Sequence, residues 1–234
     1  MKILGLIPAR GGSKGIPGKN IKLLNGKPLL AYTFESAQKS SLLSKTILSS
    51  DDAEIIQTAQ ELGLEVPFVR PTNLADDKSP TLPVIQHALR FFLEKGENFD
   101  AVCLLQTTYP FRASGLIDKA IEKFIQMDVD ALISVLPVPH EFNPHWVFEP
   151  DNSGLLNIST GEKKIISRRQ DLPPAYIRDG AIYLTKAKTL LEEGSLYGDS
   201  LTYFETDPSN YVNLDTFQDW QKAEELVLRL SPKI

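Results

Sequence analysis

The sequence predicts an α/β fold, a doubly wound and mostly parallel sheet with helices on both faces. Short apolar runs alternate with stripes of apolar residues at helical spacing along most of the chain, which is typical of βα units. The run at residues 101–105 is apolar at every position, as expected of a central parallel strand. Six prolines interrupt the alternation between residues 137 and 178. We therefore expect residues 1–234 to form one domain with a loop-rich insertion at about 137–178.

The first half of the chain predicts strands and helices in regular alternation. In chain order we expect a strand at 3–7, a helix at 28–37, a strand at 46–49, a helix at 53–62, an extended edge segment at 66–69 and a helix at 81–95. Pro28 suits the start of a helix, because its missing N–H is not needed there. Ser50 or Asp51 can cap the second helix, and Gly63 can end it.

The alternation continues on both sides of the insertion. The expected strands are 101–105, 131–136, 180–184 and 211–214, and the expected helices are 116–127, 187–193 and 217–230. In the last helix Trp220, Ala223 and Val227 recur at helical spacing and predict one buried face. Cys103 lies in the most apolar run and is expected to be a core residue.

Composition excludes several classes of protein. The chain is 42% hydrophobic, enough for a sizeable core, and its single cysteine excludes an intrachain disulfide or a cysteine-based zinc site. No apolar run approaches the length of a membrane span, about 20 residues. The net charge of −5 argues against a protein that mainly binds nucleic acid. We expect a cytoplasmic enzyme or binding protein that needs neither nucleic acid nor a membrane as partner.

The strongest candidate for a binding site is the glycine-rich loop at residues 10–20, directly after the first strand. A doubly wound sheet binds ligands at the carboxyl ends of its strands, and glycines let backbone N–H groups approach phosphate oxygens. Arg10, Lys14 and Lys19 add positive charge suited to a polyphosphate. The loop is neither a Walker A loop nor the dinucleotide fingerprint. The alternative is a basic surface turn.

The loop is also the first of several motifs that occur in one order along the chain. They span residues 8–20, 26–29, 50–55, 66–71, 104–112, 168–174, 180–183 and 215–220. In this order the set resembles the acylneuraminate cytidylyltransferases, also called CMP-sialic acid synthetases, over essentially the whole chain. The stretch at 168–174 is most similar to members that activate legionaminic acid, a bacterial relative of sialic acid.

The resemblance implies that the anomeric hydroxyl of a nonulosonic acid attacks the α-phosphate of CTP, and that pyrophosphate leaves. Such a transfer needs positioning and charge neutralisation and no covalent intermediate. The implied nucleotide-binding residues are Ala9, Arg10, Gly11, Gly12, Ser13, Lys14, Lys19, Asn20, Arg70 and Thr81. The implied sugar-binding residues are Gln106, Thr107, Arg168, Arg169, Gln170 and Tyr183. Arg10, Lys19 and Asp215 are implied to be catalytic.

The resemblance also implies a bound Mg²⁺ or Mn²⁺ ion. Members of the family carry an aspartate-x-aspartate pair on a strand near the C-terminus, and here the pair reads Asn213 and Asp215. Asp215 is the expected ligand and Asn213 a weak one, since an amide offers an oxygen without the negative charge. Alternatively, Asp215 caps the helix at 217–230. Two further departures from the family, Asp179 and Tyr109, are expected near the sugar pocket.

In the family, the insertion forms a dimer contact and sends cationic residues into the partner's active site, which implies a homodimer. Arg168, Arg169 and Gln170 suit a sugar carboxylate, because a guanidinium matches a carboxylate bidentately. Their alternative interpretation is a solvated basic turn. Two functional alternatives also stay open. One is the same chemistry with another nucleotide or acid sugar, of the GDP-legionaminate or CMP-Kdo type. The other is a catalytically weak nucleotide-binding regulator, which Asn213 motivates.

Overall fold

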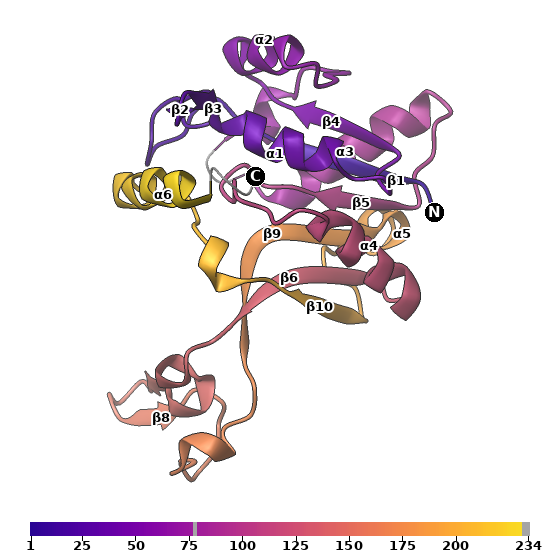
Figure 1. Cartoon of the computed structure of the whole chain (residues 1–234). Coiled ribbons are helices and arrows are strands. Elements are labelled where there is room, and N and C mark those ends of the chain that lie inside the picture. The colour runs from indigo at the N-terminus through magenta and orange to yellow at the C-terminus, as the bar shows by residue number, and fades with distance from the viewer. Residues whose placement is uncertain (77–78, 231–234) are drawn as a thin grey trace.

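The computed structural model describes residues 1–76 and 79–230. A six-stranded sheet in the order β10-β6-β9-β5-β1-β4 forms its centre (Figure 1). The strands are β1 (Ile3–Pro8), β4 (Lys45–Ser49), β5 (Ala101–Leu104), β6 (Ala131–Pro137), β9 (Tyr176–Lys186) and β10 (Leu201–Glu205). β9 runs antiparallel to both of its neighbours, and the other pairs are parallel. The predicted mostly parallel α/β sheet is confirmed.

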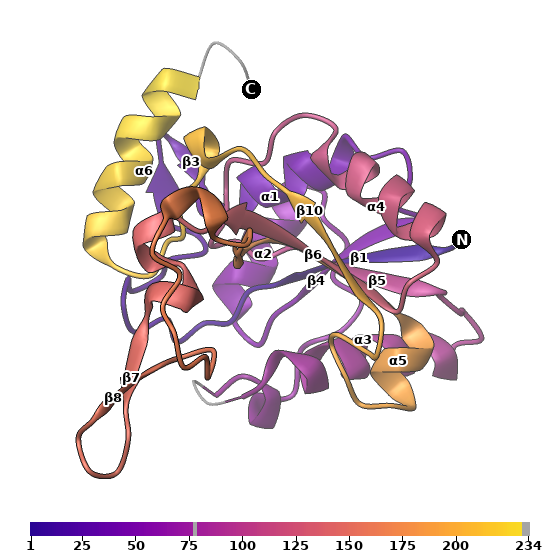
Figure 2. The ribbon, with the colours of Figure 1, turned by 90° about the horizontal axis from the view of Figure 1, so that it is seen from below.

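Helices cover both faces of the sheet, as the alternation predicts (Figure 2). They are α1 (Leu29–Gln38), α2 (Ala53–Glu61), α3 (Thr81–Glu94), α4 (Leu116–Met127), α5 (Ala187–Leu191) and α6 (Phe217–Leu230). Ile3 and Ile7 of β1 pack with α1 and α4 on one face, while Leu4 and Leu6 pack with α3 and α5 on the other. The two faces alternate along the strand because strand side chains have a period of two. Cys103 is buried in this core, as predicted.

A short hairpin that sequence reasoning missed leads into α1. It pairs β2 (Leu23–Leu24) with β3 (Lys27–Pro28) in antiparallel register. Asn25 and Gly26 form its two-residue turn with φ values of 48° and 78°. Asn-Gly is the preferred pair for such a turn, because both positions need a positive φ. Pro28 then precedes the first residue of α1, close to its predicted place.

The start of α2 corrects one prediction. Asp52 caps the helix, accepting hydrogen bonds from the backbone N–H groups of Glu54 and Ile55, whereas Ser50 and Asp51 do not cap it. The capping position must directly precede the first helical residue, and that residue is Ala53. The expected edge segment at 66–69 is not a strand either. Glu65 makes one isolated bridge to Ile47, and the pairing ends before Pro67, which has no N–H to donate.

The prediction of a strand at 211–214 is also wrong, and the sixth strand is β10. Val212 and Leu214 do alternate with more exposed neighbours, but they pack beneath α6. Any extended segment with one buried face shows the same period of two, so the pattern does not distinguish it from a paired strand. There was little signal for β10 in the sequence, because the one buried residue of this strand, Thr202, is polar.

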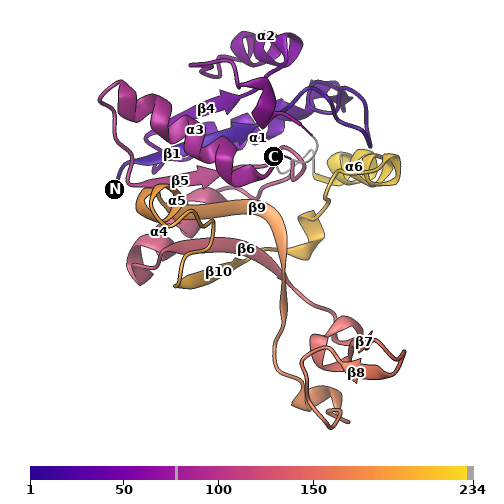
Figure 3. The same ribbon diagram turned by 180° about the vertical axis from the view of Figure 1, so that it is seen from behind.

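Residues 138–175 form an arm that projects from the sheet between β6 and β9 (Figures 1 and 3). β6 and β9 stay paired as far as Pro137 and Tyr176, so a two-stranded stalk carries the arm. Near its tip lies a hairpin of β7 (Phe148–Pro150) and β8 (Leu156–Ile158). This is the stretch expected as an insertion at about 137–178. Across residues 1–76 and 79–230, no helix combines the length and apolar character needed to cross a membrane.

Candidate active site

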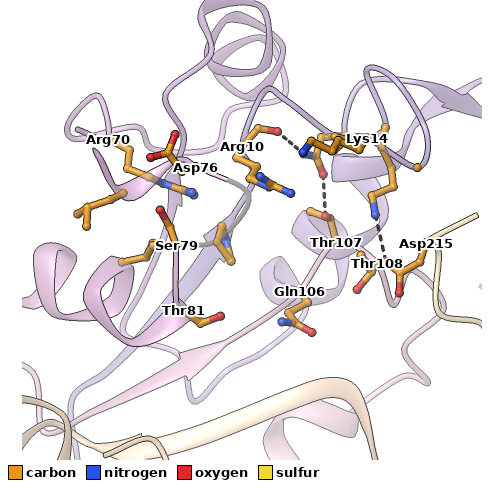
Figure 4. Close-up of a pocket in the computed structure, with 17 residues that line it drawn as sticks. Arg10, Lys14, Arg70, Asp76, Ser79, Thr81, Gln106, Thr107, Thr108 and Asp215 are labelled. Atoms are coloured by element: carbon orange, nitrogen blue, oxygen red, sulfur yellow. Dashed lines mark hydrogen bonds and ion pairs between the residues drawn. The ribbon is translucent and has the colours of Figure 1, made fainter. Parts of the chain in front are cut away.

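A cavity of about 500 Å³ opens at the carboxyl ends of β1, β4 and β5 (Figure 4). Parallel α/β sheets bind their ligands at this edge. The loop after β1, the segment before α3, the segment after β5 and Asp215 form its wall. The cavity brings together ten of the predicted site residues: Arg10, Ser13, Lys14, Lys19, Asn20, Arg70, Thr81, Gln106, Thr107 and Asp215. These residues come from four distant parts of the chain, which the fold gathers at one place.

The glycine-rich loop crosses very close to the segment that carries Asp215. A Cβ atom on Gly15 would lie 2.0 Å from the Asp215 carbonyl oxygen, so only glycine fits there. Lys19 extends from the same loop, and its Nζ donates to the Leu214 carbonyl oxygen at 2.6 Å. It lies 3.4 Å from Asp215 Oδ1. The loop and the C-terminal segment therefore form one side of the cavity together.

Lys19 is a partly desolvated cation. Its side chain is 12% exposed, and burial lowers the pKa of its ammonium group, an effect that the Asp215 carboxylate partly opposes. The positive charge of Arg10 lowers the same pKa further. A cation in such surroundings interacts strongly with an incoming phosphate, because little water screens it.

Asn20 joins the loop to the end of β5. Its buried side chain donates to the Arg10 carbonyl oxygen at 3.0 Å and accepts from Thr107 Oγ1 at 2.7 Å. Asn20 thus holds the backbone at Arg10 and the side chain of Thr107 in fixed positions on the cavity wall. Its expected contact with the nucleotide stays a prediction.

Arg70 is fixed at the end of β4. Its buried guanidinium donates from Nε to Ser49 Oγ at 3.0 Å and from Nη2 to the Ser49 carbonyl oxygen. Burial lowers the pKa of Arg70 to about 10, with Asp51 acting in the opposite direction. The group therefore remains charged at neutral pH. In Figure 4 it lies with Asp76, Ser79 and Thr81 at the end of the cavity away from Asp215.

Asp51 has a role that sequence reasoning missed, because its position suggested a helix cap. Its Oδ1 accepts the backbone N–H of Gly11 at 3.2 Å and so ties the glycine-rich loop to the end of β4. A Cβ on Gly11 would lie 2.6 Å from Asp52 Oδ2, so a larger residue would push aside the side chain that caps α2. Ala9 is buried and donates its N–H to the Ser49 carbonyl oxygen at 3.0 Å. Ala9, Gly11 and Gly12 do not line the cavity, and their expected contact with the nucleotide stays a prediction.

Asp215 does not cap α6, so that alternative is wrong. Thr216 and Asp219 cap the helix reciprocally: the Thr216 N–H donates to Asp219 Oδ2 at 2.9 Å, and the Asp219 N–H donates to Thr216 Oγ1 at 3.3 Å. Asp215 is 62% exposed and faces the cavity. Asn213 Nδ2 donates to its Oδ2 at 2.6 Å, although the two residues lie outside any strand.

These two residues offer a small set of donors for a hard divalent cation. Asp215 offers a carboxylate and Asn213 an amide oxygen. Within residues 1–76 and 79–230, no group of three or more acidic, histidine or cysteine side chains could hold a metal ion. Mg²⁺ in phosphate-transferring sites commonly takes one or two carboxylates and completes its shell with water and substrate phosphates. The donor set fits that mode of binding.

Four predicted sugar-binding residues do not line the cavity of their own chain. Arg168, Arg169 and Gln170 are exposed on the arm, where Arg168 Nε pairs with Asp171 Oδ2 at 2.7 Å. Tyr183 packs in the core beside α3 and α5, because the alternation along β9 turns it to that face. The cavity also contains Asp76, Ser79 and Thr108, which sequence reasoning did not select. The polar stretch before α3 was the only signal for Asp76 and Ser79, and Thr108 lies in the motif at 104–112.

Asp179 and Tyr109, the departures expected near the sugar pocket, are buried outside the cavity wall. Asp179 accepts hydrogen bonds from the Ser134 hydroxyl and from the Ala181 N–H at 2.9 Å. Burial raises the pKa of Tyr109 to about 12, and the charge of Asp179 adds to this effect. Both side chains belong to the packing beneath the segment that follows β5.

Known proteins resemble this chain over nearly its whole length. The family described as Cytidylyltransferase matches residues 4–212. A pseudaminic acid cytidylyltransferase of Campylobacter jejuni is 36% identical over 96% of this chain and 95% of its own. A CMP-N,N'-diacetyllegionaminic acid synthase of Legionella pneumophila is 34% identical over 97% of both chains. The structure of a CMP-2-keto-3-deoxy-manno-octonic acid synthetase complexed with CTP shares the fold, with a TM-score of 0.72, 16% identity and 98% and 99% coverage. The chain belongs to the cytidylyltransferase family.

Proposed function

We propose that the protein transfers CMP from CTP to the anomeric hydroxyl of a nonulosonic acid. The observation that carries the proposal is the cavity, which gathers Arg10, Lys14, Lys19 and Arg70 in a chain whose net charge is −5. Such a concentration of cations at the carboxyl edge of a sheet suits a nucleoside triphosphate. The relatives' names point to the acid, because two of them name pseudaminic acid and CMP-N,N'-diacetyllegionaminic acid.

The nucleotide would lie along the cavity. Arg10, Ser13 and Lys14 would bind the phosphates, and Arg70 and Thr81 would contact the nucleoside at the other end (Figure 4). The oxygen of the acid's anomeric hydroxyl forms a bond to the α-phosphorus as the bond to the β-phosphate bridging oxygen breaks. The hydroxyl proton is lost, and pyrophosphate leaves. Because the acid attacks directly, the protein needs no nucleophile of its own.

The main work of the protein would be to position the reactants and to stabilise charge. Lys19 is held by the Leu214 carbonyl at a fixed place in the cavity wall, so its charge needs no rearrangement during the reaction. Asp215, with the amide oxygen of Asn213, would hold a Mg²⁺ or Mn²⁺ ion together with phosphate oxygens. The bound ion would supply charge neutralisation at the triphosphate.

The acid would bind beside Gln106 and Thr107, which line the cavity after β5. Arg168, Arg169 and Gln170 lie on the arm, and we propose that they bind the acid in the cavity of a second copy. The arm carries exposed apolar side chains, among them Phe142, Leu155, Leu156 and Ile165. A homodimer would bury such a surface, since monomers rarely expose large apolar patches. We place the reaction in the cytoplasm, where CTP is made.

A substrate panel tests the proposal. CTP, UTP, GTP and ATP are each offered with Mg²⁺ and with pseudaminic, N,N'-diacetyllegionaminic, sialic and eight-carbon Kdo-type acids. Pyrophosphate release and the mass of the sugar nucleotide are measured. We expect turnover with CTP and a nine-carbon acid. Turnover without a preference for CTP, or only with the eight-carbon acid, contradicts the proposal. Tight CTP binding with no product from any acid favours the regulator.

A further inference from the structure

Arg112 lies behind the cavity wall with its guanidinium fully engaged by the protein. The residue is 8% exposed. Its Nε donates to the Ala181 carbonyl oxygen at 3.0 Å, and its Nη2 to that of Gln106 at 2.7 Å. Nη1 donates to the Tyr109 carbonyl oxygen at 2.7 Å and to Thr33 Oγ1 at 3.0 Å. Three of these four bonds go to backbone carbonyls, and two of those belong to the segment after β5.

That segment depends on such bonds for its conformation. Residues 106–108 line the cavity but lie in neither a strand nor a helix, so no ladder orients their peptide groups. Arg112 engages the carbonyl of Gln106, and the N–H of Leu214 engages that of Thr108 at 3.0 Å. The second bond places the next residue, Asp215. The expected sugar side and the expected metal side of the cavity are therefore linked through one short segment.

β9 belongs to the same arrangement. Gly180 has a φ of 85°, and a Cβ on it would lie 3.0 Å from Gln106 Oε1. Arg112 bonds the carbonyl of the next residue, Ala181, and so connects β9 to the backbone of Gln106. The position of the Gln106 side chain thus depends on both elements that Arg112 joins.

Burying the charge of Arg112 costs free energy, which suggests that its hydrogen bonds serve to orient the backbone around it. In residues 1–76 and 79–230, no carboxylate forms an ion pair with it, and carbonyl dipoles replace water around the cation. Burial lowers the pKa of Arg112 to about 10, and Asp179 acts in the opposite direction. An apolar side chain would fill this space at a smaller desolvation cost. A lysine could donate at most three hydrogen bonds from a single nitrogen, too few for the four acceptors.

We propose that Arg112 is a positioning residue of the transfer reaction. It touches neither substrate. It sets the orientation of residues 106–108 and, through Leu214, the place of Asp215. The inference rests on the proposed function as far as those residues bind the acid and the metal ion.

The first experiment compares Arg112→Lys with Thr33→Val. The lysine keeps the charge but loses the planar guanidinium that donates in several directions. We therefore expect kcat to fall by about 10–100-fold, as for a small misplacement of reacting groups. The KM for the acid should rise, while the Kd of CTP, measured calorimetrically without metal or acid, changes little. Thr33→Val removes only the bond to the Thr33 hydroxyl and keeps the bonds to Gln106, Tyr109 and Ala181, so it should lower Tm and leave the kinetic constants as in the parent.

Chemical rescue separates positioning from general destabilisation. Arg112 also lines a second cavity, of about 620 Å³, between α1, α6 and the segment after Tyr109. Arg112→Ala would open the guanidinium position to that cavity. Millimolar guanidinium chloride, far below denaturing concentrations, should restore part of the turnover of Arg112→Ala, and sodium chloride of equal ionic strength should not. Should Arg112→Ala fail to fold, Arg112→Lys and the exchange measurement below decide.

Hydrogen exchange provides a readout that does not require substrate. In Arg112→Lys the amides of Tyr109 and Leu214, whose acceptors are the Gln106 and Thr108 carbonyls, should exchange faster, while those of residues 10–15 do not. Parent-like kinetics with a lowered Tm, or a loss of CTP affinity as large as the rise in KM for the acid, would overturn the inference. If the parent enzyme were inactive on every acid, the proposed function would be rejected. The exchange measurement would still test whether Arg112 orients the segment after β5, because it needs no substrate.

Discussion

The pair formed by Asn213 and Asp215 is the residue-level feature on which the proposed metal binding depends. The amide donates to the carboxylate at 2.6 Å, so the pair carries one negative charge where the resemblance leads one to expect two. The sequence singled out both residues as metal ligands, a role that stays a prediction. It misplaced them on a strand, because the alternation of buried residues around them is common to any extended segment packed on one side.

We expect Asn213→Asp to lower the half-saturating Mg²⁺ concentration, on the order of 3–10-fold. The change puts a second carboxylate beside Asp215, and a divalent cation relieves the repulsion between them. Initial rates over a Mg²⁺ titration measure the effect. Asn213→Ala, which removes the amide without adding charge, is the matched control. Asp215→Ala should abolish Mg²⁺-dependent turnover. If Asn213→Asp and Asp215→Ala both showed the Mg²⁺ dependence of the parent, the pair would have no role in metal binding.

The lowered pKa of Lys19 predicts an alkaline limit of activity. Burial favours the neutral amine, so the free enzyme loses the Lys19 charge at a lower pH than an ordinary lysine would. Because the phosphates need the charged form, kcat/KM for CTP should fall as the pH rises through this pKa. Lys19→Arg should move the limit to higher pH, since a guanidinium stays charged. An unchanged alkaline limb in Lys19→Arg would assign the limit to another group.

At the scale of elements, helices were the most predictable part of the chain. The bounds of α4 and α6 agree with the sequence prediction, because stripes with a period near 3.6 residues and definite ends distinguish helices well. β10 and the β2–β3 hairpin were not predicted from the sequence, because short strands give little periodicity. The loop at 10–20 was predicted from its composition. Its fixed shape was not, because the contacts that hold it come from Asp51 and Asp215, far away in sequence.

Two glycines of that loop form a matched test of the close approach to Asp215. A Cβ on Gly15 would clash with the Asp215 carbonyl oxygen, whereas a Cβ on Gly12 would meet nothing within 4 Å. Overpacking of this kind costs about 1–3 kcal/mol. Gly15→Ala should therefore lower Tm by several degrees and reduce turnover, while Gly12→Ala leaves Tm unchanged. Equal melting temperatures for the two variants would show that the loop does not need the contact.

At the scale of the molecule, the sheet with its helices forms one body and the arm extends from it (Figure 3). The cavity in the body holds the predicted phosphate-binding residues, and the arm holds Arg168 and Arg169. Sequence reasoning located the arm through its prolines. The direction of the arm depends on the pairing of β6 with β9, and the pattern of residues along the chain does not reveal which strands pair.

Mixing two inactive variants tests whether the arm serves a second copy. Lys19→Ala removes a cavity residue and Arg169→Ala an arm residue, so each homodimer should be nearly inactive. After subunit exchange, half of the dimers are mixed, and each of these has one intact site, which predicts about a quarter of the parent activity. Mixing two different cavity variants, Lys19→Ala with Arg10→Ala, is the control and should restore none. No recovery in the first mixture, with exchange verified by mass, would place the arm residues outside the partner's site.

The stalk also bears on how this fold can change during evolution. Pro137 and Tyr176, the last residues before and after the arm, are direct neighbours in the β6–β9 ladder. The chain thus leaves the sheet and returns to it at one point, and everything between these residues can lengthen, shorten or diverge without shifting the register of the core. If the arm binds the acid as proposed, its residues can change as a separate module, while the cavity at the edge of the sheet keeps its geometry.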